Sequence, residues 1–152
     1  MPFGRKKVVI GFKGSRVFFG WKVLLRNVKI NIIIMLLKDF QVYNLAMDLG
    51  EEVYSIVNVW SYFDKDTVGK QLVRSADSVA ANLSEGLGRY HYKERKNFSY
   101  YSRGSLFETI TWITKAHNRG LMDDETFKRL HDNLNTISVK INNYIKSIGT
   151  KE

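Results

Sequence analysis

The chain is 152 residues long, which allows one domain but leaves no room for a second sizeable core. Hydrophobic residues make up 44% of it and charged residues 26%, a balance that excludes wholesale disorder. The absence of cysteine excludes disulfides, thiolate metal ligands and cysteine nucleophiles, and it is compatible with a reducing environment. We therefore expect one globular domain in the cytoplasm.

The formal net charge of +9 is concentrated at the start of the chain. Residues 1–38 hold nine of the 24 lysines and arginines and no acid, so the other 15 bases balance the 15 acids of residues 39–152. A strongly basic protein is expected to have an anionic partner such as nucleic acid. Here that expectation applies to the first segment, because the remainder of the chain is formally neutral.

Residues 1–37 keep neither a helical nor a strand period, and we interpret them as an irregular basic extension. Their longest charge-free apolar run, residues 30–37, is far shorter than the roughly 20 residues that span a bilayer. Three interpretations stay open: a basic arm for nucleic acid or an anionic membrane surface, an organelle-targeting peptide, or upstream sequence that precedes a true start at Met35. We expect no membrane partner for the domain itself.

From Lys38 onward apolar residues recur every three or four positions, which marks one buried face on each of four helices. The predicted core faces are Val42, Leu45, Leu49, Val53, Ile56 and Trp60; then Val68, Leu72, Ala76, Val79, Ala80 and Leu83; then Phe98, Ser102, Ser105, Thr109, Trp112 and Ala116, flanked by Leu106, Ile110 and Ile113; and last Phe127, Leu130, Leu134, Ile137, Ile141, Ile145 and Ile148.

Polar residues and glycines separate these four segments. Acidic residues suit a helix start and glycine suits a helix end. The predicted boundaries are a start at Asp64 and Asp66, a break at Gly86 and Gly88, an end at Asn118–Gly120, a start at Asp123–Glu125 and an end at Gly149. Such short connections force sequential helices to run antiparallel. We predict an all-α, antiparallel up-down-up-down four-helix bundle over residues 38–149.

The motifs of catalytic helical bundles are missing. A di-iron bundle needs Glu-x-x-His pairs, and the chain contains none. The three histidines, His91, His117 and His131, fall near predicted helix ends or in polar surroundings. The pair Gly86 and Gly88 lacks both the third glycine and the preceding strand of a dinucleotide fingerprint. We predict no catalytic residue, no metal and no cofactor, and hence no enzyme.

Polar residues follow one side of the helix over residues 64–85 at spacings of four, four and three, and others cluster in the middle of the next helix. A mid-helix glycine costs about 1 kcal/mol relative to alanine, which indicates a close approach of another backbone at Gly104. We interpret the set as a hydrogen-bonded seam within the bundle or between subunits, with a ligand or nucleic-acid site as the lesser alternative and catalysis as the least. The polar seam comprises Arg74, Ser78, Asn82, Glu85, Gly86, Gly104, Ser105 and Glu108.

A second cluster, residues 89–96, places basic residues beside two tyrosines after Gly88. Basic side chains can hold phosphates while aromatic rings stack on bases, although such runs are more often solvated surface. The candidate nucleic-acid-binding residues are Arg89, Tyr90, Lys93, Arg95, Lys96 and Arg103.

Several of these motifs occur together in one known family. They are the segments 38–47, 71–76 and 78–86 followed by Arg89, then 98–101, 104–108 and 118–121. In this order they resemble the bacterial four-helix-bundle family named after the protein encoded in the intervening sequence of 23S ribosomal RNA genes, over residues 36–148. Arg74-Ser75 replaces a pair of arginines in the family's pattern, and Ser84 replaces an alanine.

The resemblance implies a homopentamer around a central channel and no established enzymatic activity. The chain is also similar to the accessory bundle protein of diversity-generating retroelements, which pairs with a reverse transcriptase and binds RNA. Our leading hypothesis is a non-catalytic assembly or adaptor protein that forms a homo-oligomer. The alternative is an oligomer that binds RNA or DNA through its basic patches and N-terminal arm.

Overall fold

The computed structural model describes residues 25–28, 31 and 35–149. The chain divides into two units, Met1–Met35 and Leu36–Glu152. In the first unit the described residues, 25–28, 31 and 35, are helical. The competing interpretations of the basic extension fall largely on residues that lie outside this description.

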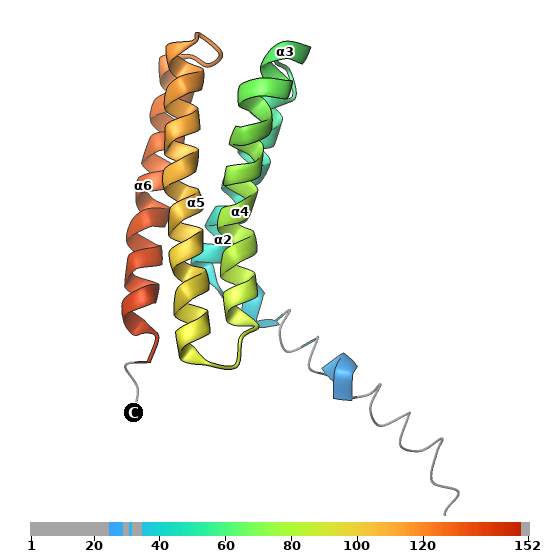
Figure 1. Cartoon of the computed structure of the whole chain (residues 1–152), viewed down its shortest axis with the longest axis vertical. Coiled ribbons are helices and arrows are strands. Elements are labelled where there is room, and N and C mark those ends of the chain that lie inside the picture. Colours follow the sequence, from blue (N-terminus) through green and yellow to red (C-terminus); the bar gives the residue numbers. More distant parts are fainter. Residues whose placement is uncertain (1–24, 29–30, 32–34, 150–152) are drawn as a thin grey trace, which may run out of the picture. The chain divides into compact units, whose positions relative to one another are not determined.

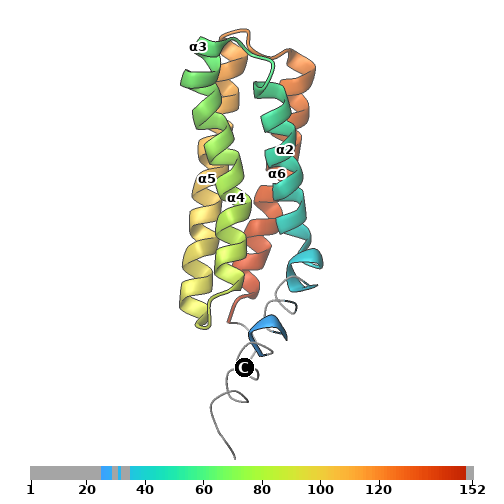
Figure 2. The ribbon, with the colours of Figure 1, turned by 90° about the vertical axis from the view of Figure 1, so that its right-hand side faces the viewer.

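The second unit is built from long helices, and no strand occurs among the described residues, which confirms the all-helical prediction. The long helices are α2 (Gln41–Val57), α4 (Lys70–Leu87), α5 (Tyr92–Asn118) and α6 (Asp124–Ser147). They lie side by side, and the connections between successive long helices alternate between the two ends of the bundle (Figures 1 and 2). Helix α4 packs against α2 and α5, and α6 packs against α5 and α2.

Helix α4 is the continuation of two shorter elements, the helical turn α3 (Tyr62–Asp64) and the π-helical segment η1 (Lys65–Gly69). The predicted start at Asp64 and Asp66 is therefore wrong by a few residues. The cap is Ser61, whose hydroxyl oxygen accepts a hydrogen bond from the backbone N–H of Asp64 at 3.2 Å. Gly69 lets α2 pack closely on the π-helical segment, because a Cβ there would lie 2.6 Å from Cγ1 of Val57.

The observed core follows two of the predicted faces closely and departs from the other two. All six residues predicted on the second face are buried, as are all those of the fourth face except the half-buried Phe127. In α2 the buried face includes Ala46 and Val57, which displace Leu45 and Ile56 to the margin.

In α5 the buried face is rotated relative to the prediction. It contains Ser99, Leu106 and Ile113, whereas Phe98 and Trp112 are half-buried. The Trp112 side chain lies at the margin because its indole N–H needs a partner, and it donates to Oε1 of Glu108 at 3.4 Å.

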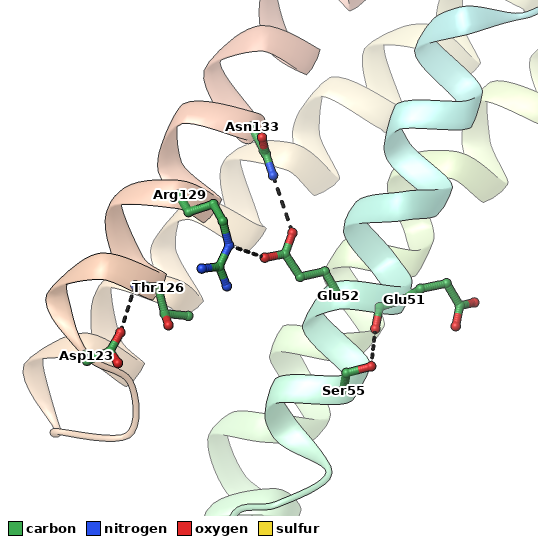
Figure 3. Close-up of polar contacts among 7 residues, drawn as sticks. All are labelled: Glu51, Glu52, Ser55, Asp123, Thr126, Arg129 and Asn133. Carbon is green, nitrogen blue, oxygen red and sulfur yellow. Dashed lines mark hydrogen bonds and ion pairs between the residues drawn. The ribbon is translucent and has the colours of Figure 1, made fainter.

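The predicted boundaries of the last two helices are confirmed. Gly120 has a φ of +71°, and the N–H of Leu121 turns back to donate to the carbonyl of Ala116 at 2.9 Å. The carboxylate of Asp123 accepts from the N–H of Thr126 at 2.7 Å and opens α6 (Figure 3). This hydrogen bond lowers the pKa of Asp123 below its usual value. Gly149, with a φ of +79°, follows the end of α6.

A polar cluster joins α2 to α6 on the exterior of the bundle (Figure 3). Glu52 on α2 accepts from Nε of Arg129 at 2.8 Å and from Nδ2 of Asn133 at 3.3 Å. The Glu52 carboxylate raises the pKa of Arg129 above its usual value. Neighbouring Glu51 points away from this cluster in Figure 3. The pairing adds little stability at such an exposed position.

Candidate functional site

The inner part of the polar seam joins α4 to α5 within one chain. Asn82 on α4 donates from Nδ2 to the carbonyl of Ser78 at 2.8 Å and to Oγ of Ser105 on α5 at 3.4 Å. Because Asn82 and Ser105 are half-buried, this contact satisfies polar groups that have limited access to water. Of the predicted seam residues, Ser78, Asn82 and Ser105 are thus brought together.

The seam extends into the core through hydroxyl groups that were not predicted as site residues. Ser102 donates to the carbonyl of Val79 at 2.7 Å, and Oγ1 of Thr109 lies 3.1 Å from Oγ of Ser75. All three hydroxyl residues are at most 2% exposed. Buried polar groups need partners, so these contacts specify how α4 and α5 fit together. The signal in the sequence is that these hydroxyl residues occupy the apolar stripes of their helices. Ser102 and Thr109 belong to the predicted core face of α5, whereas Ser75 is absent from the predicted face of α4.

The charged members of the seam lie on the surface. Arg74, Glu85 and Glu108 are all exposed. Glu85 forms an ion pair with Arg89 one turn further along, and Glu108 accepts from the indole of Trp112. The structure therefore does not bring Arg74 into contact with either glutamate.

The two glycines of the seam have opposite surroundings. Gly86 is buried, and a Cβ there would lie 3.0 Å from Cβ of Phe98 and 3.2 Å from the carbonyl oxygen of Arg95. Gly104 is exposed, and a Cβ there would meet nothing within 4 Å. Among the described residues the close backbone approach predicted at Gly104 does not occur. It occurs at Gly86, because of these two glycines only Gly86 faces the neighbouring helix.

Gly104 lies within an exposed aromatic face on α5. Tyr100, Tyr101 and Phe107 surround it at helical spacings of three and four and are 41%, 58% and 56% exposed. We call these four residues the α5 aromatic face. Beside it Arg103 places its guanidinium 5.1 Å from the ring centre of Tyr100 and donates to Oδ1 of Asn142 at 3.1 Å.

A groove of about 320 Å³ runs between α2 and α4. Its walls are made largely of small side chains, with two carboxylates among them. Burial and the nearby Glu51 raise the pKa of Asp77 above its usual value. We call this feature the α2/α4 groove; it is lined by Tyr43, Ala46, Met47, Gly50, Glu51, Asp77, Ala80, Ala81 and Ser84.

Apart from Arg103, the candidate nucleic-acid-binding residues lie in the α4–α5 connection (Arg89 and Tyr90) and along the first turns of α5 (Lys93, Arg95 and Lys96). Tyr90 is 90% exposed, and Lys93 is also exposed. Arg89 is half-buried, pairs with Glu85 and places its guanidinium 4.7 Å from the ring centre of Phe98. The half-buried Lys96 also lies in these turns, whereas Arg103 lies two turns further along α5. The guanidinium groups of Arg89 and Arg103 therefore already form polar and cation–π contacts within the chain.

His117 and His131 contact neighbouring side chains of the bundle. His117 lies 2.7 Å from a carboxylate oxygen of Asp124 and stacks on Phe127, and His131 contacts Asn135 at 3.1 Å. Among the described residues no group of three histidine or acidic side chains could hold a metal ion. Nor does any helix in that part of the chain have the length and apolar character needed to cross a bilayer.

Comparisons with known proteins place the chain by family and fold. No protein of curated function matches it. A solved structure similar to it, with 16% sequence identity and a TM-score of 0.63, covers 70% of this chain and 99% of its own length. That structure is a protein of unknown function from the S23 ribosomal protein family of Bacteroides thetaiotaomicron. The profile of one protein family matches residues 38–143, and the chain therefore belongs to the 23S rRNA-intervening sequence protein family.

Proposed function

We propose that this chain is a non-catalytic assembly protein of the cytoplasm. In this proposal it is an antiparallel up-down-up-down four-helix bundle that self-associates into a ring of five copies and serves as a scaffold or adaptor. The observation that carries the proposal is the α5 aromatic face, in which three exposed rings surround Gly104.

The composition of this face favours contact with protein. Exposed aromatic side chains supply large apolar area and dominate the energetics of interfaces. Gly104 lowers the helix propensity of α5 at a position where no described residue of the chain requires glycine. A second copy packed against α5 would account for both features, since it would cover the rings and approach the helix backbone at the glycine.

The α2/α4 groove is the surface that best complements this face. Its small side chains, Ala46, Gly50, Ala80, Ala81 and Ser84, leave room for aromatic rings. Its carboxylates, Glu51 and Asp77, complement the positive charge that Arg103 places beside the α5 aromatic face. Contact between two different surfaces is heterologous, and a heterologous contact generates a ring when its rotation closes.

Light scattering coupled to size exclusion tests the proposal. Phe107→Ser should dissociate the native assembly into smaller species, because truncating an interface anchor costs about 2 kcal/mol or more, roughly a thirtyfold loss of affinity. Val139→Ser on α6 is the control, since Val139 is similarly exposed, at 61%, but lies on neither proposed surface. A monomeric native chain, or equal masses for native protein and Phe107→Ser, would contradict the proposal.

Gly104→Ala separates assembly from folding. In the isolated chain the new methyl group meets none of the described residues, so helix propensity predicts a gain of about 1 kcal/mol in folding stability. In the assembly the same methyl group would block the close approach. We expect a lower mass together with an unfolding midpoint, measured in dilute protein, that does not fall. An unchanged mass would refute the role given to Gly104.

A second candidate function, binding of RNA or DNA, is favoured by one observation. Tyr90, in the connection that leads into α5, and Lys93, in the first turn of α5, are both exposed, and Lys96 lies one turn further on. An exposed ring beside cations suits stacking on a base and contact with phosphates. Several copies in one assembly would multiply a weak contact.

Gel-shift titrations of structured RNA over a salt series test this second function. The full chain is compared with a chain that begins at Met35. Salt-sensitive binding by both would place the contact on the bundle, and binding by the full chain alone would place it in the basic extension. No binding by either at low salt would refute it.

A further inference from the structure

A small pocket opens between the first turns of α5 and the last turn of α6. The start of α5 and the end of α6 lie at the same end of the bundle (Figure 1). Its volume is about 170 Å³, below the range of about 300–1,000 Å³ that is usual for drug-sized ligands. It can therefore take a small ion or a single group of a larger molecule. The pocket is lined by Tyr92, Arg95, Tyr144, Ser147, Ile148 and Gly149.

Two hydrogen-bond donors on residues that line this pocket have no partner among the described residues. Nε of Arg95 and the hydroxyl of Tyr144 are buried, and neither forms a hydrogen bond within the described part of the chain. Buried donors are nearly always satisfied, because an unmet donor loses its hydration without compensation. Two unmet donors in one pocket indicate that the pocket binds an acceptor.

The charge of the pocket indicates which acceptor. Arg95 forms no ion pair with any described residue, and the described residues that line the pocket include no acidic side chain. Its Nη2 donates to the carbonyl of Arg89 at 3.3 Å, which helps to fix the guanidinium. Burial raises the pKa of Tyr144, with the charge of Arg95 acting in the opposite direction, so the phenol remains a proton donor at neutral pH.

From this geometry we infer that the Arg95–Tyr144 pocket binds an oxyanion of the phosphate class. A guanidinium and a phenol both donate to oxygen, and charge-assisted hydrogen bonds from arginine to phosphate are among the strongest that proteins make. The phosphate could be a free anion or one phosphodiester of a nucleic-acid strand, since both present the same oxygens. This inference does not depend on self-assembly.

Thermal unfolding in buffers of equal ionic strength, with chloride replaced stepwise by inorganic phosphate, tests the inference first. Phosphate should raise the unfolding midpoint of the native protein, since a ligand that binds only the folded state stabilises it. Tyr144→Phe should abolish most of that rise, because loss of one hydroxyl weakens binding by about tenfold. The same variant should be no less stable than the native protein without phosphate, because it removes an unmet donor.

Tyr54→Phe is the control, because this exposed tyrosine on α2 lines neither the α2/α4 groove nor the Arg95–Tyr144 pocket and should respond to phosphate as the native protein does. Arg95→Gln is the second variant and should lose the response more completely. A response to phosphate that survives in Tyr144→Phe, or no response in the native protein together with oligonucleotide binding that ignores both variants, would overturn the inference.

A single-stranded oligonucleotide distinguishes the two sources of phosphate. If Tyr144→Phe weakens both phosphate and oligonucleotide binding, the pocket accepts a phosphodiester. If it weakens phosphate binding alone, the pocket holds a free anion. Either result supports the inference.

Discussion

Substituting alanine for Gly86 tests how closely α4 and α5 approach at the end of the seam. The new Cβ would lie 3.0 Å from Cβ of Phe98 and 3.2 Å from the backbone oxygen of Arg95. Both atoms belong to the backbone or Cβ positions of α5, so relieving the contact requires α4 and α5 to move apart by a few tenths of an ångström. Overpacking of this kind costs about 1–3 kcal/mol, which exceeds the gain in helix propensity of up to about 1 kcal/mol. We expect Gly86→Ala to lower the free energy of unfolding by about 1–2 kcal/mol.

Gly88→Ala supplies the matched control two residues further on. Gly88 is exposed and has a φ of −73°, and its Cβ would find ordinary contacts at 3.5 Å and 3.8 Å. Alanine there should be neutral or stabilising by a few tenths to about 1 kcal/mol, because it restricts the unfolded chain. Urea unfolding followed by circular dichroism measures both variants. If Gly86→Ala proved as stable as Gly88→Ala, the close approach of the helices at Gly86 would be refuted.

Three further perturbations have defined outcomes. Ser102→Ala removes a buried hydroxyl that donates to a carbonyl of α4 and should cost about 1 kcal/mol in urea unfolding; no loss would mean that this hydroxyl does not join the helices. Asp123→Ala should lower the unfolding midpoint near pH 7 but not near pH 2. The pKa of Asp123 is lower in the folded protein than in the unfolded chain, so its carboxylate stabilises the fold at pH values above the unfolded-state pKa. That stability is lost as the pH falls through the folded-state pKa. Asp77→Asn should act in the opposite sense, because a raised pKa costs stability as pH rises. It should raise the midpoint near pH 7 and leave it unchanged near pH 2, and a fall near pH 7 would contradict the partial desolvation of that carboxyl.

The helical character of the chain could be predicted because the spacing of apolar residues and the residues expected at helix ends indicated the same segments. The second and fourth core faces were predicted accurately, because almost all large apolar residues of these two helices fall on a single stripe. In α5 the period was ambiguous, because serines and threonines alternate with large aromatic residues. The structure buries the small hydroxyl residues, which fit between closely packed helices, and leaves the large rings at the margin.

The candidate site was only partly accessible to the same reasoning. Helical spacing correctly grouped Asn82 and Ser78 on one side of α4. It could not reveal that Arg74 and Glu85 extend into solvent, because spacing along one helix does not fix how the neighbouring helix is rotated. The Arg95–Tyr144 pocket was missed for a related reason, since its two donors come from helices that lie far apart in the sequence.

Native mass spectrometry of mixed variants tests most directly whether copies of this chain join through two different surfaces. Phe107→Ser alters the α5 aromatic face, and Ala81→Trp fills the α2/α4 groove. Each variant alone should give mainly the mass of one chain, 17.7 kDa for the native sequence. An equimolar mixture should give a two-chain species, because each pair retains one intact face and one intact groove. Native-like assemblies from either variant alone, or a mixture without two-chain species, would contradict the account.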